Sequence, residues 1–336
     1  MAVSVSLKKL AEILGLAPST VSRALKGHPD ISRATQERVR ALAQELHYKP
    51  SALALSLRNK RSNSIAMLVP FLGNYFYACA VSSVIRSAYS SGYKVIVFEN
   101  GEDYEQEVKI CQFLQKSGID GLVVAPARTT NDLDHFVKLQ HEGIPMVFFD
   151  RICTGILTDR VVVDDYAGVC SAVEYLIRSG CRRIAFFGSP SHLAISNNRR
   201  MGYEDALRKN GLPVDKELIK ICDNYTEALR LTPELLSLPN RPDAFFAVND
   251  ETAIGVLNVV KAKGVRIPDE VSICGFTNNS LAEVSDPLLT SVDQHGYELG
   301  AIAMRLLIER LNGVRDGDRI VSKIIKTNLV VRQSTR

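Results

Sequence analysis

The strongest constraint on the fold is a regular alternation of short apolar runs with helical patterns, which starts near residue 65 and continues to the C-terminus. Polar residues do not interrupt most of these runs, so each is expected to be a strand buried on both faces. Strands separated by helices form a parallel, doubly wound sheet. The runs predicted as strands are 65–70, 94–99, 121–125, 145–150, 183–188, 218–222, 244–249, 271–276, 290–293 and 320–331.

The predicted strands fall into two successive series, so we expect an α/β body made of two similar lobes. The helical patterns between them include 75–90, 104–116, 167–178, 198–210 and 252–263. We place the body at residues 63–336, with one lobe of about 63–163 plus 293–319 and another of 164–292 plus 320–336. Parallel sheets bind ligands at the carboxyl ends of their strands, and two facing lobes form a cleft that can close by a hinge motion.

Composition excludes several classes of protein. Apolar residues make up 46% and charged residues 23% of the 336 residues, which is a globular balance. The sequence has no uncharged apolar run long enough to cross a membrane, and Lys8, Lys9 and Glu12 interrupt what a secretory signal would need as its apolar core. Seven scattered cysteines fit neither a disulfide framework nor a zinc cluster. We therefore expect a cytoplasmic protein with no metal and no cofactor.

Charge is concentrated at the N-terminus. Residues 1–62 contain eleven lysines or arginines and four acids, a net charge of +7, whereas the remaining 30 basic and 33 acidic residues give −3. A small basic segment attached to a mildly acidic body indicates a polyanionic partner for that segment.

Residues 1–49 are predicted to form three short helices. Ser6 and Ser32 can cap the first and third helices, Gly15 permits a tight turn, and Pro18 suits the first turn of the second helix. Helical spacing gives the first helix an apolar stripe made of Leu7, Leu10, Ala11 and Leu14. Two short helices joined by a glycine turn and braced by a third form a helix-turn-helix.

In a helix-turn-helix the start of the second helix reaches base edges in the major groove. This assigns DNA contacts to Pro18, Ser19, Ser22 and Arg23. Arg23 can pair with guanine through two hydrogen bonds, and Pro18 can contact a thymine methyl group. The alternative for these helices is a module that binds another protein.

Residues 50–62 are predicted to be a hinge that contains a short helix. A helix of about two turns is marginal alone, so it would form when it gains a partner. Leu57 could insert between base steps in the minor groove, and the basic cluster at 58–61 could hold phosphate. The alternative is a plain linker.

The stretch LAEILGLAPSTVSRALKG and the residues up to Arg58 resemble the DNA-binding head and hinge of the LacI/GalR family of bacterial transcription regulators. The resemblance covers nearly the whole chain and implies lobes like those of periplasmic binding proteins. It also implies a homodimer on a near-palindromic operator, with paired hinge helices and Leu57 in the minor groove. Ser6 and Thr20 join the candidate DNA contacts. Ala17 departs from the family, which more often has serine as the cap there.

Amides, carboxylates, guanidinium groups and aromatic rings follow the predicted strands of the body. Such groups suit a polyhydroxylated ligand, because its hydroxyls need paired donors and acceptors and its C–H face packs on a ring. We assign effector contacts to Asn74, Tyr75, Phe76, Asp150, Arg151, Arg199, Tyr225, Asn249, Thr277 and Gln294. A helix cap is the alternative role for Asn74 and for Asp250. The family usually has aspartate where Thr277 stands, which leaves the identity of the effector open.

Motifs of catalysis are missing. The sequence contains no GxxxxGK[ST], GxGxxG, GxSxG or HExxH, and Ser189–His192 is its best enzyme-like cluster. We therefore predict a non-enzymatic transcription regulator, a repressor, whose DNA affinity depends on a sugar-like effector between the lobes. The alternatives are a cytosolic sugar-binding protein with a protein-binding head, and an enzyme that uses the cleft.

Overall fold

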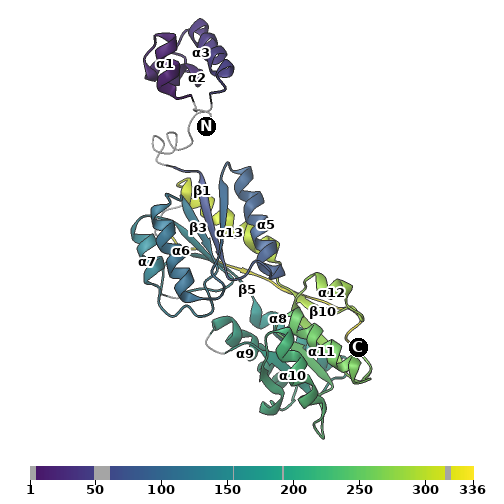
Figure 1. The fold of residues 1–336 in the computed structure, drawn as a ribbon. Coiled ribbons are helices and arrows are strands. Elements are labelled where there is room, and N and C mark those ends of the chain that lie inside the picture. Colours follow the sequence, from purple (N-terminus) through teal and green to yellow (C-terminus); the bar gives the residue numbers. More distant parts are fainter. Residues whose placement is uncertain (1–4, 49–60, 154, 191–192, 315–318) are drawn as a thin grey trace. The chain divides into compact units, whose positions relative to one another are not determined.

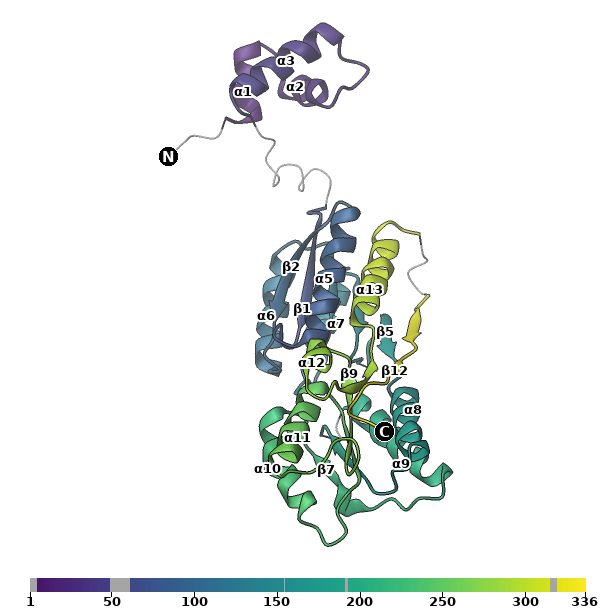
Figure 2. The ribbon, with the colours of Figure 1, turned by 90° about the vertical axis from the view of Figure 1, so that its right-hand side faces the viewer.

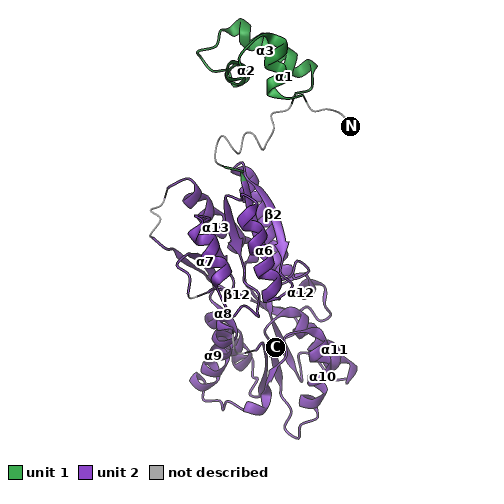
Figure 3. Cartoon of the chain, turned by 60° about the vertical axis from the view of Figure 1, so that its left-hand side comes forward, with its two compact units in different colours: residues 1–63 green, residues 64–336 purple. Residues whose placement is uncertain are grey.

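The computed structural model describes residues 5–48, 61–153, 155–190, 193–314 and 319–336. It divides into two compact units, residues 1–63 and 64–336 (Figure 3). Leu57 and most of the predicted hinge lie outside the described residues, so the predictions made for them stay predictions.

The first unit is a three-helix head made of α1 (Leu7–Leu14), α2 (Pro18–Leu25) and α3 (Arg33–Glu45). The Ser6 hydroxyl accepts a hydrogen bond from the backbone N–H of Lys9 at 3.2 Å, and Gly15 ends α1 with a φ of +64°. Leu10, Val21 and Val39, one from each helix, are fully buried and join the three helices. The predicted helix-turn-helix is confirmed.

The second unit contains two six-stranded sheets, each covered by helices on both faces (Figures 1 and 2). The first sheet has the order β11-β5-β4-β3-β1-β2 and is parallel throughout. α5 (Tyr75–Ser90) and α13 (Gly296–Leu311) cover one face, and α6 (Tyr104–Lys116) and α7 (Asp134–His141) cover the other. Its strands are β1 (Ser64–Val69), β2 (Lys94–Glu99), β3 (Gly121–Val124), β4 (Met146–Phe149), β5 (Asp159–Val163) and β11 (Ser322–Ile325).

The second sheet has the order β12-β10-β9-β8-β6-β7, and β12 pairs antiparallel to β10 while the other strands are parallel. α8 (Asp165–Arg178) and α9 (Ala194–Lys209) cover one face, and α10 (Tyr225–Leu236) and α11 (Asp250–Ala262) cover the other. Its remaining elements are β6 (Ile184–Gly188), η1 (Lys216–Leu218), β7 (Ile219–Ile221), β8 (Ala244–Ala247), β9 (Ser272–Thr277), α12 (Ser280–Val284), β10 (Thr290–Asp293) and β12 (Asn328–Val330).

These two sheets confirm the predicted α/β class with two doubly wound lobes, and two details of the prediction are wrong. β5 was not predicted, because charged residues at its start hide it; the buried Asp159 accepts hydrogen bonds from Arg310 and from the Val321 N–H. The single strand predicted over 320–331 is two strands, since the chain leaves the first sheet after Ile325 and enters the second at Asn328. Residues 322–325 therefore belong to the first lobe.

Close helix packing fixes the first lobe. A Cβ atom at Gly300 of α13 would lie 2.4 Å from the carbonyl oxygen of Ala80 in α5, so only glycine lets these two helices approach this closely. Gly296, at the start of α13, likewise lies against Phe76. The starts of α5 and α13 are held together at the edge of the sheet where the strands end. Across the described residues, no helix is both long and apolar enough to cross a membrane.

Candidate functional site

The exposed face of α2 carries the residues predicted to contact DNA. Val21 and Ala24 are fully buried, which turns Pro18, Ser19 and Arg23 outward. Thr20 and Ser22 are half-buried on the flanks of the same helix. Ser6 uses its hydroxyl as the cap of α1, which does not prevent contact with a phosphate.

Arg23 is available for an external partner. Its side chain is 58% exposed, and its guanidinium lies 4.0 Å from Asp30, at the limit of an ion pair. An exposed pair at this distance contributes little, about 0–1 kcal/mol, so Arg23 can exchange Asp30 for a base or phosphate at small cost. α2 also has no acidic residue in its first turn, which favours approach to an anion.

A cavity of about 270 Å³, here called the interlobe pocket, lies where the two lobes of the second unit meet. Residues that follow strands of both sheets line it, as expected for the carboxyl ends of parallel strands. The structure brings eight of the ten predicted effector residues to it: Asn74, Phe76, Asp150, Arg151, Arg199, Asn249, Thr277 and Gln294.

Two predicted effector residues do not line the interlobe pocket. Tyr75 lies in a neighbouring cavity with Cys79 and Tyr297, because the first turn of α5 directs consecutive side chains to different sides. Tyr225 begins α10, and its hydroxyl accepts a hydrogen bond from Asn258 of α11 at 3.0 Å. The prediction that these two residues contact an effector stays a prediction.

Two amides of the interlobe pocket have a structural role that limits them as ligand contacts. The side-chain oxygen of Asn74 caps α5 by accepting a hydrogen bond from the Phe76 N–H at 2.9 Å. Asn249 caps α11 through the Thr252 N–H at 2.8 Å, and its amide nitrogen donates to the Asp223 carbonyl. The alternative role considered for Asn74 is therefore present in the structure. Asp250 is no cap: its carboxylate is buried and accepts from Ser291 and Asn279.

Arg199 is held firmly in the wall of the second lobe. Its Nε donates to Asp165 at 2.8 Å, its Nη1 donates to the Val248 carbonyl at 2.8 Å, and the guanidinium lies 4.1 Å from the centre of the Phe276 ring. Burial raises the pKa of Asp165 to about 6, although Arg199 acts to lower it. These contacts orient Arg199 before any ligand arrives.

Asp150 provides a buried acceptor in the first lobe. The Tyr77 hydroxyl donates to its Oδ2 at 2.7 Å. Burial raises the pKa of Asp150, and the nearby Arg151 partly opposes this. Its backbone has a φ of +61°, in the left-handed region that residues other than glycine adopt only rarely. Tyr77 was not among the predicted contacts, because the prediction considered only Tyr75 and Phe76, the two aromatic residues directly before it.

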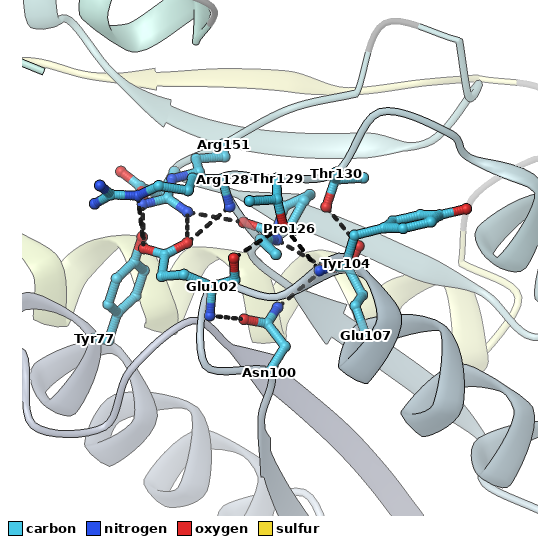
Figure 4. Close-up of polar contacts among 12 residues, drawn as sticks. Tyr77, Asn100, Glu102, Tyr104, Glu107, Pro126, Arg128, Thr129, Thr130 and Arg151 are labelled. Atoms are coloured by element: carbon cyan, nitrogen blue, oxygen red, sulfur yellow. Dashed lines mark hydrogen bonds and ion pairs between the residues drawn. The ribbon is translucent and has the colours of Figure 1, made fainter. Parts of the chain in front are cut away.

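Glu102 organises the arginines of the first lobe (Figure 4). Its two carboxylate oxygens accept from Arg151 Nη1 at 2.5 Å and Nη2 at 2.8 Å, which is a two-bond fork. The backbone N–H of Arg128 also donates to Glu102 at 2.7 Å. Burial alone would raise the pKa of Glu102, but the hydrogen bonds from Arg151 and Arg128 outweigh it and lower that pKa.

Glu107 fixes the loop that carries Arg128 (Figure 4). This fully buried carboxylate accepts from the Ala127 N–H at 2.8 Å and from the Thr130 hydroxyl at 2.7 Å. Asn100 and His135 complete its partners at 3.0 Å each. Arg128 then extends to Asp223 of the second lobe, with 3.3 Å between Nη1 and Oδ2. This ion pair joins the two lobes at the interlobe pocket.

The wall that the second lobe contributes to the interlobe pocket contains a residue with a strained backbone. Thr277, at the end of β9, has a φ of +124°, a conformation that costs a β-branched residue about 1–3 kcal/mol. Its hydroxyl donates to the Gln294 side-chain oxygen at 2.9 Å. The Thr–Gln pair replaces the carboxylate that the family resemblance leads one to expect here.

Sequence analysis did not find several lining residues, which include Phe71, Tyr77, Glu102, Arg128, Asp223 and Glu251. Glu102, Arg128 and Asp223 follow β2, β3 and β7, so the same strand-end rule would have found them had it been applied to every strand.

Comparisons with known proteins agree with this architecture. A family model described as bacterial regulatory proteins, lacI family, matches residues 6–51, and one described as a periplasmic binding protein-like domain matches residues 173–335. The HTH-type transcriptional repressor CytR of Escherichia coli strain K12 is 30% identical over 332 residues, which cover 98% of this chain and 96% of the relative.

Two solved structures are similar over almost the whole chain. The transcriptional regulator CelR in complex with cellobiose is 27% identical, with a TM-score of 0.74 and coverage of 98% of this chain and 99% of that chain. The lac repressor dimer bound to operator and the anti-inducer ONPF has a TM-score of 0.85 at 22% identity and covers 99% of both chains, which shows the shared fold. CytR is named as a transcriptional repressor and CelR as a transcriptional regulator. The chain belongs to the LacI family of bacterial regulatory proteins and is a DNA-binding transcription regulator.

Proposed function

We propose that this protein is a cytoplasmic repressor that binds a near-palindromic operator as a homodimer and responds to a sugar-like effector held in the interlobe pocket. The observation that supports it best is the pocket itself. It combines carboxylates, guanidinium groups and amides with the rings of Phe71 and Phe76, which suits a ligand with many hydroxyls. CytR is named a repressor and CelR is named with cellobiose, which support the same assignment by similarity.

The head is proposed to read DNA with α2. Pro18, Ser19, Thr20, Ser22 and Arg23 would contact base edges and phosphates of the major groove, and Ser6 would contact the backbone at the start of α1. Leu57 remains the proposed minor-groove contact of the hinge.

Dimerisation is proposed to use the outer side of α5 and the edge strand β2 in the first lobe, together with α12 in the second. Ile85 and Tyr89 of α5 are 45% and 83% exposed, and Ile96 of β2 is 44% exposed. Leu281 and Val284 of α12 are exposed as well. Large apolar side chains gathered on one side are expected to be covered by a second protein.

Control by the effector requires that it bind one lobe arrangement better than the other. The ion pair between Arg128 and Asp223 and the oriented Arg199 would contribute contacts that depend on lobe position. A ligand that favours one arrangement would then shift the population of the DNA-binding state.

Fluorescence anisotropy with labelled genomic fragments that compete against heparin tests the DNA assignment, and thermal shift against a sugar panel tests the effector. We expect one fragment to bind in preference, with an affinity that falls steeply with salt. Arg23→Ala should weaken binding to that fragment and relax the preference for it, and Arg199→Ala should abolish the ligand response while operator binding survives. A chain that prefers no duplex under any ligand would refute the proposal.

A further inference from the structure

The arginines of the interlobe pocket are already paired with carboxylates. Arg151 forms its two-bond fork with Glu102, and Arg199 donates to Asp165. Arg128 lies 3.3 Å from Asp223 across the lobes and 3.8 Å from Glu102. Among the described lining residues, each guanidinium therefore faces at least one acid within ion-pair distance.

Acids exceed bases around the pocket. Glu102, Asp150, Asp223 and Glu251 line it together with the three arginines. The Tyr77 hydroxyl donates to Asp150, and Glu251 is exposed. Among the described lining residues, a phosphate placed here would meet acids and guanidinium groups that already lie beside a carboxylate. Bringing like charges together without a partner of opposite charge is unfavourable at a protein interface.

Glu102 has the largest influence on the charge of the interlobe pocket, because it contacts two of the three arginines. Its carboxylate occupies both terminal nitrogens of Arg151, which are the donors that a phosphate would use. It also holds the backbone of Arg128. Its side chain is 25% exposed and lines the interlobe pocket, so the fork lies at the pocket surface.

We propose that Glu102 sets the charge preference of the interlobe pocket: it neutralises Arg151 and Arg128, so that the protein takes an uncharged polyhydroxylated effector and rejects the phosphate ester of the same molecule. This inference rests on the proposed function, since it concerns the effector of that same pocket. Glu102 acts here as a specificity-determining residue.

Replacement of Glu102 by glutamine tests the proposal with little change in shape. The glutamine oxygen can still accept the Arg128 N–H, so the loop keeps its hydrogen bond, whereas the negative charge on Arg151 is lost. Glu251→Gln is the matched control. It removes one negative charge from the same pocket at a residue that forms no ion pair with a described arginine.

Inorganic phosphate is the first probe, titrated against the full-length chain in a thermal-shift assay with sodium chloride to hold ionic strength constant. D-ribose and D-ribose 5-phosphate form the second, matched pair. Ligands that bind the folded state raise its melting temperature by mass action. We expect the Glu102→Gln variant to bind phosphate at least about tenfold more tightly than wild type, and Glu251→Gln to resemble wild type. Arg151→Met added to Glu102→Gln should reverse the gain.

Three results would overturn the proposal. The first is that wild type binds ribose 5-phosphate or phosphate as tightly as Glu102→Gln does. The second is that Glu251→Gln gains as much affinity for phosphate as Glu102→Gln. The third is that the gain in affinity for phosphate remains when Arg151→Met is added to Glu102→Gln. If Glu102→Gln does not fold by circular dichroism, the wild-type comparison of ribose with its phosphate decides, since tighter binding of the phosphate ester refutes the claim. Operator binding of wild type is measured separately, so a failure of the proposed DNA-binding function is seen independently.

Discussion

The variant Asp165→Asn measures how the buried carboxylate that orients Arg199 changes the stability of the protein with pH. Asp165 is 5% exposed at the start of α8, and burial raises its pKa from 3.8 to about 6 even though Arg199 donates to it at 2.8 Å. The folded protein therefore holds this proton more tightly than the unfolded chain does. The stability that Asp165 contributes is complete below about pH 4 and is lost as the pH rises through 6.

The size of the effect follows from the two pKa values. A difference of about two pKa units corresponds to roughly 3 kcal/mol of unfolding free energy, of which about 2 kcal/mol falls between pH 4.5 and 7.5. Asparagine does not titrate but keeps an oxygen for the Arg199 Nε. The free energy of unfolding of wild type, minus that of Asp165→Asn, should therefore fall by about 2 kcal/mol over this range.

Urea unfolding followed by circular dichroism at 222 nm measures this difference, because the chain has no tryptophan to report on fluorescence. Asp250→Asn is the comparison variant. Burial also raises the pKa of Asp250 to about 6, but its carboxylate accepts from Ser291 and Asn279 instead of an arginine. Both variants should show the same trend with pH. If the ion pair with Arg199 outweighed burial, the difference for Asp165→Asn would rise with pH, and the reasoning would be refuted.

Three further predictions concern the head, the second lobe and the contact between lobes. Arg23→Ala should weaken binding to the preferred fragment by about 1–3 kcal/mol and relax its sequence preference, measured by anisotropy on matched and mutated duplexes; equal loss on all duplexes would contradict a base contact. Gly202→Ala should lower the free energy of unfolding by about 1–3 kcal/mol, because its Cβ would lie 2.6 Å from the Tyr166 carbonyl oxygen between α8 and α9; an unchanged urea midpoint would contradict that packing. Asp223→Asn should weaken the contact with Arg128 and increase the radius of gyration of the effector-free second unit in X-ray scattering, whereas an unchanged profile would show that the ion pair does not hold the lobes.

Sequence patterns predicted the sheets well because most strands are buried on both faces. Strands such as β3 and β4 consist wholly of buried residues, so an uninterrupted apolar run reveals them. β5 alternates in burial and begins with Asp159, whose buried carboxylate accepts from the Val321 N–H and pairs with Arg310, a residue 151 positions away. No local pattern contains that partner, and the strand was therefore missed.

The location of the candidate site was predictable for a related reason. Parallel sheets place all of their strand ends at one edge, so polar residues after strands converge whatever their separation along the chain. The direction in which a side chain points from the first turn of a helix is less predictable from sequence. Phe76 lines both the interlobe pocket and the neighbouring cavity, whereas Tyr75 lines the neighbouring cavity and not the interlobe pocket, and the sequence gives no reason to prefer one ring over the other.

The rule that ligands bind at the carboxyl ends of parallel strands does not predict the charge around the ligand. The sequence alone does not indicate an ion-pair partner for Arg151, which follows β4. In the structure it donates two hydrogen bonds to Glu102, which lies in a loop after β2. β1 and β3 stand between those two strands in the sheet, so the pairing depends on the strand order and not on sequence distance. The same arginine would favour an anionic ligand if position 102 were neutral. The chemistry of the interlobe pocket is therefore decided by which loops the topology brings together, and a single residue outside the recognised motifs can reverse it.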